Sequence, residues 1–431
     1  MKIGFICPEF IGHLNPMTAL GRELARRGHE ITVLARPDAQ AKVLGADLGF
    51  YPLGQSEFSP DALARQRAKL GGLSATAALR HTIEMLRLSA RILLHDAPQA
   101  VRALGLDALV VDQVTPAGGT VADELGLPHV QVCNALALNP DPWLPPATLP
   151  WRFRRGFLPR IANRVANLAG LILASRIGSI EQDYRRRLGL PIKRYPDQMT
   201  YLAEISQQPA FFDFPRRLPP PRFHYTGPWH SLGESRGIDF PWEKLDGRPL
   251  VYASLGTLQT RLEHFFEIIA EAVAGLDAQL VISLGDPQRE TTALASRCKG
   301  RPVIVSVAPQ LELLKIASIG ITHAGLNTVL ESLAQGVPMV AIPITNDQPG
   351  VARRLEWLGA GHVITPSRLT PAQLRKLIES NMGESPLRQK ARWCRERIAS
   401  VDGLKSAGDL VEAAFSTAKP PRGFPGQPAN L

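Results

Sequence analysis

The chain has 431 residues, 45% of them hydrophobic and 20% charged, and a formal net charge of +10 at pH 7. Disordered chains carry more charge and fewer apolar residues, so this composition excludes one, and the length predicts two or three globular domains. The four cysteines, Cys7, Cys133, Cys298 and Cys394, form neither a CxxC pair nor a cluster with histidine. We therefore expect no disulfide framework, no zinc site and a reducing, cytoplasmic location.

Short apolar runs alternate with helical stretches through the first half of the chain. The runs predict strands at residues 2–7, 30–34, 108–112 and 129–133. Asn15 as N-cap and Pro16 in the first helical position predict a helix that runs to about Arg27 and ends at Gly28. Such alternation is typical of a parallel sheet with helices on both faces.

The second half repeats this scheme, with strands predicted at 250–254, 279–283, 303–307, 319–322 and 338–342 and helices at 263–274, 310–316 and 327–335. The predicted fold class is α/β, with two doubly wound, Rossmann-like domains that face each other across a cleft. The expected boundaries are a first domain at 1–219, a proline-rich linker at 220–248, a second domain at 249–403, a helix at about 404–417 that packs back on the first domain, and a disordered tail at 418–431.

Positive charge is concentrated between residues 151 and 217, where thirteen Lys/Arg against five Asp/Glu give +8. One interpretation is a solvated basic face. The interleaved Trp151, Phe153 and Phe157, followed by the apolar stretch 168–173, favour a peripheral contact with an anionic membrane over nucleic acid. No apolar run approaches the roughly 20 residues that span a bilayer. Pro8 and Glu9 interrupt the N-terminal run too early for a secretion signal.

Several common chemistries lack their motifs. The chain contains no GxGxxG, no GxxxxGK[ST] and no HExxH, which disfavours hydride transfer and metal-dependent hydrolysis. An Asp-x-Asp pair, the simplest way to hold Mg²⁺ on a diphosphate, is also missing from the sequence. A phosphate site here would have to use backbone N–H groups, helix ends and side chains, without a metal.

The second half carries a candidate anion site at 319–328, a strand followed by a glycine turn and a helix start. Gly325 lets the backbone approach a ligand, while Asn327 and Thr328 lie in the first turn, where free N–H groups attract phosphate. His323 adds a donor, and Glu331, one turn after Asn327, can hold a vicinal diol such as a ribose. Further polar residues at expected strand ends are Thr257, Asp347 and Gln348.

The first half supplies a candidate base. His13 follows the first predicted strand, and Asp112 ends a later strand of the same sheet, so both are expected at its carboxyl edge. A carboxylate that bonds one imidazole nitrogen fixes the tautomer and stabilises the cation formed when the other nitrogen takes a proton. The alternative is that each residue only caps the helix that follows it.

A run of motifs at fixed spacing lies at 308–310, 322–328, 331, 336–339, 343 and 347–348. Together with Gly12-His13-Leu14-Asn15-Pro16 in the first half, it resembles the donor-binding box of the UDP-glycosyltransferases with the GT-B fold, glycosyltransferase family 1. The segments 310–314 and 344–351 look most similar to the bacterial zeaxanthin (carotenoid) glucosyltransferase branch. The resemblance covers nearly the whole chain.

The resemblance implies a first domain that binds an acceptor and a second that binds a nucleotide sugar. In the donor site, Ala308 and Gln310 would contact uracil and ribose, and Glu331 the ribose hydroxyls. The other donor roles would fall to Thr257, His323, Gly325, Asn327 and Thr328 at the diphosphate and to Asp347 and Gln348 at the hexose. His13 would be the base and Asp112 its partner.

The implied reaction is an inverting transfer of glucose from UDP-glucose to a hydroxyl of a lipophilic acceptor, such as the carotenoid zeaxanthin, giving a β-glucoside without metal or cofactor. Val307 and Leu326 stand where plant members have tryptophan, which leaves a TDP-sugar open. Three alternatives remain: the same reaction on a macrolide, flavonoid or sterol; a sugar-nucleotide epimerase; and a basic binding protein without catalysis. A location on the inner face of the membrane would suit a lipophilic acceptor.

Overall fold

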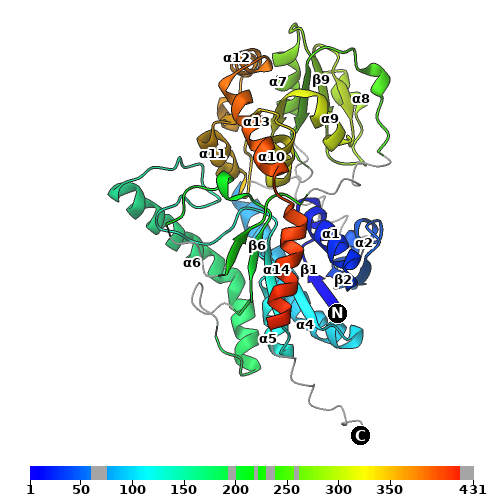
Figure 1. The fold of residues 1–431 in the computed structure, drawn as a ribbon, viewed down its shortest axis with the longest axis vertical. Coiled ribbons are helices and arrows are strands. Elements are labelled where there is room, and N and C mark those ends of the chain that lie inside the picture. The colour runs from blue at the N-terminus through cyan, green and yellow to red at the C-terminus, as the bar shows by residue number, and fades with distance from the viewer. Residues whose placement is uncertain (60–74, 193–199, 218–221, 230–237, 257–261, 418–431) are drawn as a thin grey trace.

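The structure, a computed structural model, describes residues 1–59, 75–192, 200–217, 222–229, 238–256 and 262–417. Two parallel β-sheets lie one above the other, each accompanied by helices (Figure 1). The first sheet is built from the first half of the chain and the second sheet from the second half. This arrangement confirms the predicted α/β fold class.

The first sheet has seven strands in the order β3-β2-β1-β4-β5-β6-β7, and all its pairs are parallel. Its strands are β1 (Lys2–Ile6), β2 (Glu30–Ala35), β3 (Gly49–Pro52), β4 (Ala108–Asp112), β5 (His129–Cys133), β6 (Glu204–Ser206) and β7 (Phe223–Tyr225). The helices of this half are α1 (Ile11–Arg26), α2 (Gln40–Leu44), α4 (Ala75–Leu104), α5 (Ala117–Leu125) and α6 (Phe157–Arg187), with short 3-10 turns at η1 (Pro37–Ala39) and η2 (Ala210–Phe212).

Successive side chains of a strand point to opposite faces of the sheet, and the central strands are buried on both faces. Phe5 and Val110 pack in one cluster with side chains of α1, whereas Ile6 and Val111 pack in another with side chains of α4 and α5. These continuous apolar runs are the reason why β4 and β5 occupy the ranges predicted for them.

Helix α1 begins earlier than predicted. It starts at Ile11 and carries Pro16 inside, where the sequence suggested a start at Pro16 capped by Asn15. The chain turns at Phe10, whose carbonyl accepts from the N–H groups of His13 and Leu14. His13 therefore lies in the first turn of α1, directly beyond the carboxyl edge of the sheet.

The linker expected at 220–248 also begins too early. Phe223–Tyr225 form β7, which pairs with β6 at the edge of the first sheet. Each of these strands has only three residues, too few for an apolar run to be recognised beside a proline cluster. A 3-10 turn, η3 (Trp242–Lys244), lies further along this stretch, and residues 230–237 lie outside the described residues.

The second sheet has six parallel strands in the order β10-β9-β8-β11-β12-β13. They are β8 (Leu250–Ser254), β9 (Gln279–Ser283), β10 (Val303–Val305), β11 (Ala317–Thr322), β12 (Met339–Ala341) and β13 (Gly361–Val363). The helices are α7 (Glu263–Val273), α8 (Thr292–Ala295), α9 (Gln310–Ile316), α10 (Leu326–Ala334), α11 (Gln348–Leu358), α12 (Pro371–Met382) and α13 (Pro386–Ala399), with η4 (Pro366–Arg368).

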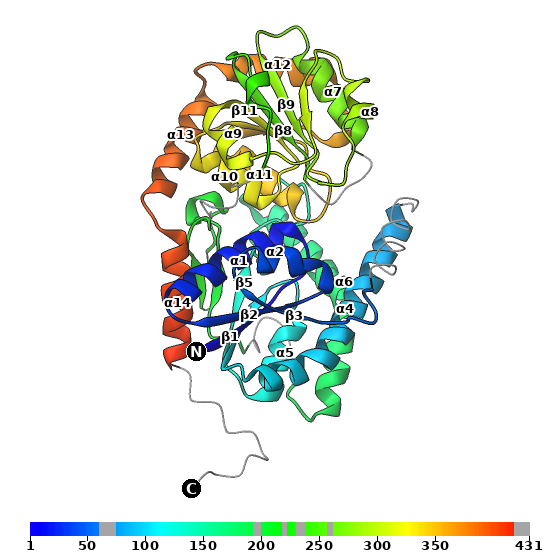
Figure 2. The same ribbon diagram turned by 90° about the vertical axis from the view of Figure 1, so that its right-hand side faces the viewer.

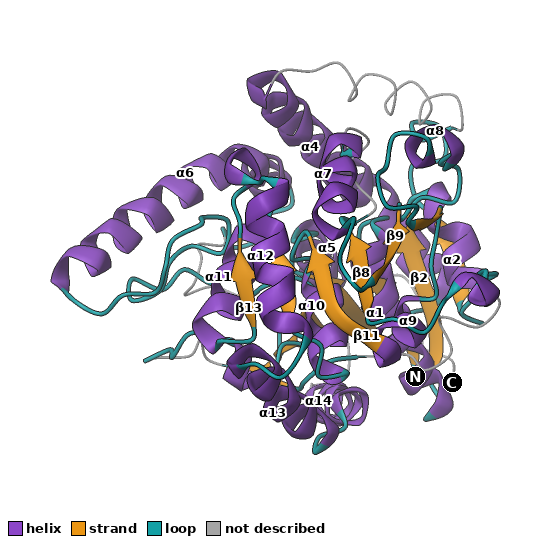
Figure 3. Cartoon of the chain, turned by 90° about the horizontal axis from the view of Figure 1, so that it is seen from above, coloured by secondary structure: helices purple, strands orange, loops and turns teal. Residues whose placement is uncertain are grey.

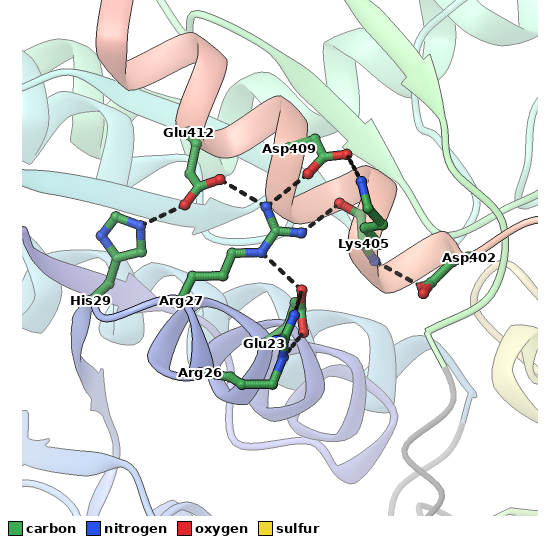
Figure 4. A network of polar contacts seen from close by, with 8 residues as sticks. All are labelled: Glu23, Arg26, Arg27, His29, Asp402, Lys405, Asp409 and Glu412. Atoms are coloured by element: carbon green, nitrogen blue, oxygen red, sulfur yellow. Dashed lines mark hydrogen bonds and ion pairs between the residues drawn. The ribbon is translucent and has the colours of Figure 1, made fainter.

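The last helix, α14 (Gly403–Thr417), returns to the first half and lies along α1 (Figure 2). Arg27, directly after α1, bonds to Glu23, Asp409 and Glu412 at 2.7–2.8 Å (Figure 4). Gly408 makes room for this guanidinium, since a Cβ there would lie 2.6 Å from its central carbon. The tail expected to be disordered at 418–431 lies outside the described residues.

Candidate active site

The two sheets meet at their carboxyl edges. The N–H of Leu136, which follows β5, donates to Asp347 Oδ2 at 3.0 Å in the turn before α11. The Nδ2 of Asn327, at the start of α10, donates to the carbonyl oxygen of Gly12 at 2.9 Å. In open α/β sheets ligands bind outside the carboxyl ends of the strands, so this junction is the expected place for a site.

His13 and Asp112 form the pair that the sequence predicted. The imidazole Nδ1 lies 2.7 Å from Asp112 Oδ2, and the carboxylate is fully buried. Asp112 also accepts from the side chain of Asn134 at 2.5 Å and from the N–H of Val114 at 2.8 Å. Because a carboxylate oxygen accepts in this contact, the imidazole proton sits on Nδ1 and the lone pair of Nε2 is left for a substrate.

The surroundings make His13 more basic. Burial alone lowers its pKa, but the charge and hydrogen bond of Asp112, with the charges of Asp347 and Glu9, outweigh burial and raise the pKa above the usual value. Asp347 belongs to the second half of the chain, so both halves set the basicity of one imidazole. This combination suits a base that must take a proton near neutral pH.

A ring of hydrogen bonds joins the base to the second half. The side chain of Asn134 donates to Asp112, and its carbonyl oxygen accepts from Gln207 Nε2 at 2.7 Å. The same amide nitrogen donates to Asn327 Oδ1 at 2.7 Å, and Asn327 closes the ring at Gly12, next to His13. The sequence did not single out Asn134 or Gln207, although Asn134 directly follows β5 and Gln207 directly follows β6.

A cradle for an anion lies at the start of α10. Its N-cap is Gly325, and within the described residues no side chain caps the first turn, so N–H groups there remain for a ligand. The imidazole of His323 lies against Gly325 and Gly256. A Cβ at Gly325 would come within 2.5 Å of its Nε2, and a Cβ at Gly256 within 2.7 Å. Only glycines leave space for the imidazole here, and Gly256 and Gly325 lie just after two neighbouring strands, β8 and β11.

His323 is neutral in the free protein. Burial lowers its pKa to about 4, against a smaller opposing effect of a hydrogen bond to the Ser254 backbone. A diphosphate brought to this cradle would favour the protonated imidazole, since an opposite charge raises the pKa of a histidine. His323 can therefore stay uncharged in the free protein and take up a proton when a phosphate binds.

A second polar cluster lies beside the cradle. Gln310, the first residue of α9, donates through Nε2 to Glu331 at 2.5 Å and to Thr328 Oγ1 at 3.4 Å, and accepts from the Tyr252 hydroxyl at 3.1 Å. Ala308, two residues before Gln310, is buried. The structure thus brings together the three residues predicted at uracil and ribose, Ala308, Gln310 and Glu331, with Thr328, which was predicted at the diphosphate. It adds Tyr252, which the sequence did not single out.

Three predicted donor residues have contacts that the sequence did not indicate. Asn327 turns its side chain to Gly12 and Gln207, and Gln348 turns its side-chain oxygen back to the N–H groups of Ile344 and Thr345 at 2.9 Å. Asp347 accepts from Leu136, and burial raises its pKa, partly offset by that bond and by the charge of His13. Thr257 lies outside the described residues. The roles assigned to these residues stay predictions.

Helix α11, which begins directly after Asp347, contacts the first half of the chain. Gly350 lies so close to the backbone of Ala147 that a Cβ would come within 2.1 Å of its oxygen. One turn later, Arg354 donates to Asp213 Oδ1 at 2.7 Å, and both side chains are almost fully buried. Asp213 also accepts from Arg216 at 2.7 Å and from Tyr225 at 2.6 Å.

Among the described residues, no three or more His, Cys, Asp and Glu side chains gather as a metal site, and no helix is long and apolar enough to cross a membrane. What the junction offers is an imidazole–carboxylate pair from one half and an uncapped helix start with a buried imidazole from the other. These parts can deprotonate a neutral nucleophile and stabilise a phosphate leaving group.

Comparisons with known proteins agree with this chemistry. The profile of the family described as "UDP-glucoronosyl and UDP-glucosyl transferase" matches residues 3–390. The zeaxanthin glucosyltransferase of Pantoea ananas is 30% identical over 421 residues, 96% of either chain, and that of Pseudescherichia vulneris is 31% identical over 414 residues, 95% of this chain and 97% of the relative.

Among solved structures, the glycotransferase of kitacinnamycin superposes with a TM-score of 0.74 at 22% identity and covers 96% of this chain and 98% of its own. This likeness confirms the GT-B arrangement of two Rossmann-like halves. Because the family profile spans most of the chain and relatives align along its whole length, the protein is a sugar-transferring enzyme that belongs to the UDP-glucoronosyl and UDP-glucosyl transferase family.

Proposed function

We propose that this enzyme transfers glucose from UDP-glucose to a hydroxyl group of a lipophilic acceptor, a carotenoid such as zeaxanthin, and forms a β-glucoside. The observation that carries the proposal is the His13–Asp112 pair, which is tied through Asn134, Gln207 and Asn327 to the start of α10. The full-length similarity to two zeaxanthin glucosyltransferases supports the choice of acceptor.

The proposed reaction is a single in-line displacement. His13 Nε2 takes the proton of the acceptor hydroxyl, and Asp112 stabilises the imidazolium that forms. The hydroxyl oxygen then attacks the anomeric carbon from the face opposite UDP, so the C–O bond to the diphosphate breaks and the configuration inverts. An α-linked donor therefore gives a β-linked product.

The leaving diphosphate collects negative charge as the bond breaks. The N–H groups at the start of α10 and the imidazole of His323 are the groups proposed to stabilise it, in a place where burial strengthens electrostatic attraction. In this scheme these groups do the work without a metal ion. Gln310 and Glu331 are the proposed contacts of the uracil and ribose, and Asp347 and Gln348 those of the glucose.

A second candidate is the same chemistry on another small natural product, a macrolide, flavonoid or sterol, with UDP- or TDP-glucose. Val307 and Leu326 stand where plant members have tryptophan, and this difference leaves a TDP-sugar as the alternative donor. A cytoplasmic location remains a prediction from the cysteine pattern.

The test is mass spectrometry of reactions that contain UDP-glucose, zeaxanthin in detergent micelles, and a panel of other lipophilic alcohols. We expect a glucosylated carotenoid with a β-anomeric NMR coupling, and His13→Ala should lower its rate of formation about 10²- to 10⁴-fold. Glucosylation of a different alcohol alone would select the second candidate. Turnover of UDP-glucose into another UDP-sugar without any alcohol would instead identify an epimerase, and unchanged properties of His13→Ala would identify a binding protein.

A further inference from the structure

Helix α6 exposes an apolar stripe that nothing in the active site uses. Leu158, Ile161, Val165, Leu168 and Ile172 recur at intervals of three and four residues, which places them on one face of the helix. Their side chains are 44–75% exposed, and every residue from 168 to 175 is exposed. This end of α6 extends away from the rest of the chain in two perpendicular views (Figures 1 and 3).

A cavity of about 240 Å³ opens where α6 begins, and five arginines line it: Arg154, Arg155, Arg160, Arg216 and Arg217. The guanidinium groups of Arg160 and Arg217 lie over the ring of Trp143, 4.2 and 3.9 Å from its centroid. Gly156, the N-cap of α6, also lines the cavity, so the positive end of the helix dipole adds to the arginine charges.

Within the described residues, most of these arginines have no carboxylate partner. Arg216 pairs with Asp213, but for Arg154, Arg155, Arg160 and Arg217 the described part of the chain provides no carboxylate within 4.0 Å. The same holds for Arg164 on α6 itself. By contrast, Arg152 pairs with Glu356 at 2.9 Å, so it does not belong to this set. Convergent, unpaired guanidinium groups around a cavity select an anion, and phosphate oxygens match their geometry.

We propose that the stripe and the arginine cavity together dock on the surface of an anionic phospholipid bilayer. The cavity would take a lipid phosphate, and the stripe would lie among the first acyl carbons, as interfacial helices do. A second copy of the chain is a poorer occupant, because it would bring the same unpaired arginines against each other. Nucleic acid is a poorer occupant too, because it offers nothing for the apolar stripe.

One loop connects this surface to the active site. The side chain of Asn134 holds Asp112, Leu136 bonds to Asp347, Leu138 is exposed, and Trp143 reaches the arginine cavity. Asn167 of α6 donates to the carbonyl of Asp141 in the same loop at 3.1 Å. If the proposed function holds, on which this last step rests, the lipophilic acceptor enters from the bilayer along this loop.

The test is flotation with vesicles of pure phosphatidylcholine and of a phosphatidylcholine–phosphatidylglycerol mixture, without donor or acceptor. The wild type should float with the mixed vesicles only. Arg154→Gln/Arg155→Gln/Arg164→Gln should weaken this binding about a hundredfold, because each basic residue near an anionic surface contributes about fivefold. Leu158→Ser/Val165→Ser/Ile172→Ser should weaken it at least tenfold, while the control Arg368→Gln/Lys376→Gln/Arg395→Gln, exposed cations of the second half, should bind like the wild type.

Equal binding to both vesicle types, or equal loss in the control variant, would overturn the proposal. A stripe variant that turns a dimer into a monomer in light scattering would overturn it as well and would assign the stripe to a second copy. All substituted positions are exposed, and thermal melting checks that each variant is folded. Vesicle binding is measured without donor or acceptor, so a negative transferase assay does not change the conclusion about membrane binding. If both hold, the arginine variant should glucosylate zeaxanthin normally in detergent and slowly in vesicles.

Discussion

Asn327 of α10 donates a hydrogen bond to the carbonyl oxygen of Gly12, the residue before the proposed base, at 2.9 Å. This carbonyl is available because Pro16, four residues further along α1, has no N–H to donate to it. A proline inside a helix thus opens a bonding position that the other half of the protein fills. The turn that carries His13 and the helix proposed to bind the diphosphate are aligned by the same side chain.

This contact gives Asn327→Ala a distinctive expected result. The first-turn N–H of residue 327 remains for the diphosphate, so the dissociation constant of UDP should change less than about threefold. The two lost hydrogen bonds, to Gly12 and Gln207, should instead lower kcat about tenfold by loosening the alignment of His13. Calorimetry with UDP and steady-state kinetics measure the two separately. A large loss of UDP affinity with kcat intact would mean that the amide contacts the diphosphate, as the motif alone suggests.

The pH dependence of kcat/KM should report His13. The imidazole acts as a base only when it is neutral, and the charge of Asp112 helps to raise its pKa above the usual 6.5, so the rate should fall as the pH drops through a value above 6.5. Asp112→Asn removes that charge, while burial still lowers the pKa. The acid limb should therefore move to lower pH, and the maximum rate should fall about 10³- to 10⁴-fold because the tautomer is no longer fixed. An acid limb at the same pH in the variant would assign it to a different group.

Long, buried strands could be predicted from the sequence, because they are continuous apolar runs with clear ends. The strands predicted at 108–112, 129–133, 250–254 and 279–283 agree residue by residue with β4, β5, β8 and β9. The short strands β6 and β7 could not be predicted in this way, since three residues leave no periodic pattern. The start of α1 was misplaced because Pro16 is tolerated well inside a helix when another group bonds the freed carbonyl.

In the candidate site, too, some features could be predicted from the sequence and others could not. Residues whose position depends on a strand end, such as His13 with Asp112 and His323 with Gly325, could be brought together from the order of strands and turns alone. Side-chain directions could not, because Asn327 takes partners that tertiary packing brings to it, and Gln348 turns back to N–H groups of its own loop. Gln207 was not recognised because it follows the short strand β6. Its side-chain amide donates one hydrogen bond to Asn134 in the first half and one to Asn327 across the junction.

Asp213 should be the most sensitive position of the contact between the two halves. Burial tends to raise the pKa of this carboxyl, but the charges of Arg354 and Arg216 and the Tyr225 hydroxyl hold it well below its usual value. Asp213→Asn leaves two buried guanidinium groups without a counter-charge and should lower the free energy of unfolding by about 3–5 kcal/mol. Arg354→Met should cost less, since Arg216 still neutralises the carboxylate and Tyr225 still donates a hydrogen bond to it.

Urea unfolding near neutral pH compares these two variants, and acid titration adds a second readout. A carboxyl with a lowered pKa stabilises the folded state above the unfolded pKa of about 4, and this contribution is lost as the pH falls towards the folded pKa. Stability of the wild type should therefore decline more steeply below pH 4 than that of Asp213→Asn. A larger loss in Arg354→Met than in Asp213→Asn would contradict the view that Asp213 is the centre of the network.

Glu331 should decide between UDP- and TDP-sugars. Its carboxylate already accepts from Gln310 at 2.5 Å beside the cradle, and a charged acceptor there suits both hydroxyls of a ribose. The deoxyribose of dTDP has no 2′-hydroxyl, so the wild type should prefer UDP-glucose. Glu331→Ala should lower kcat/KM for UDP-glucose about 10- to 100-fold, the effect of a hydrogen bond to a charged group, and lower it for dTDP-glucose much less. Glu312→Ala is a matched control, because Glu312 pairs with Lys315 on the exposed side of the neighbouring α9. Equal losses with both donors would show that Glu331 does not bond the 2′-hydroxyl, because this is the sugar hydroxyl that dTDP lacks.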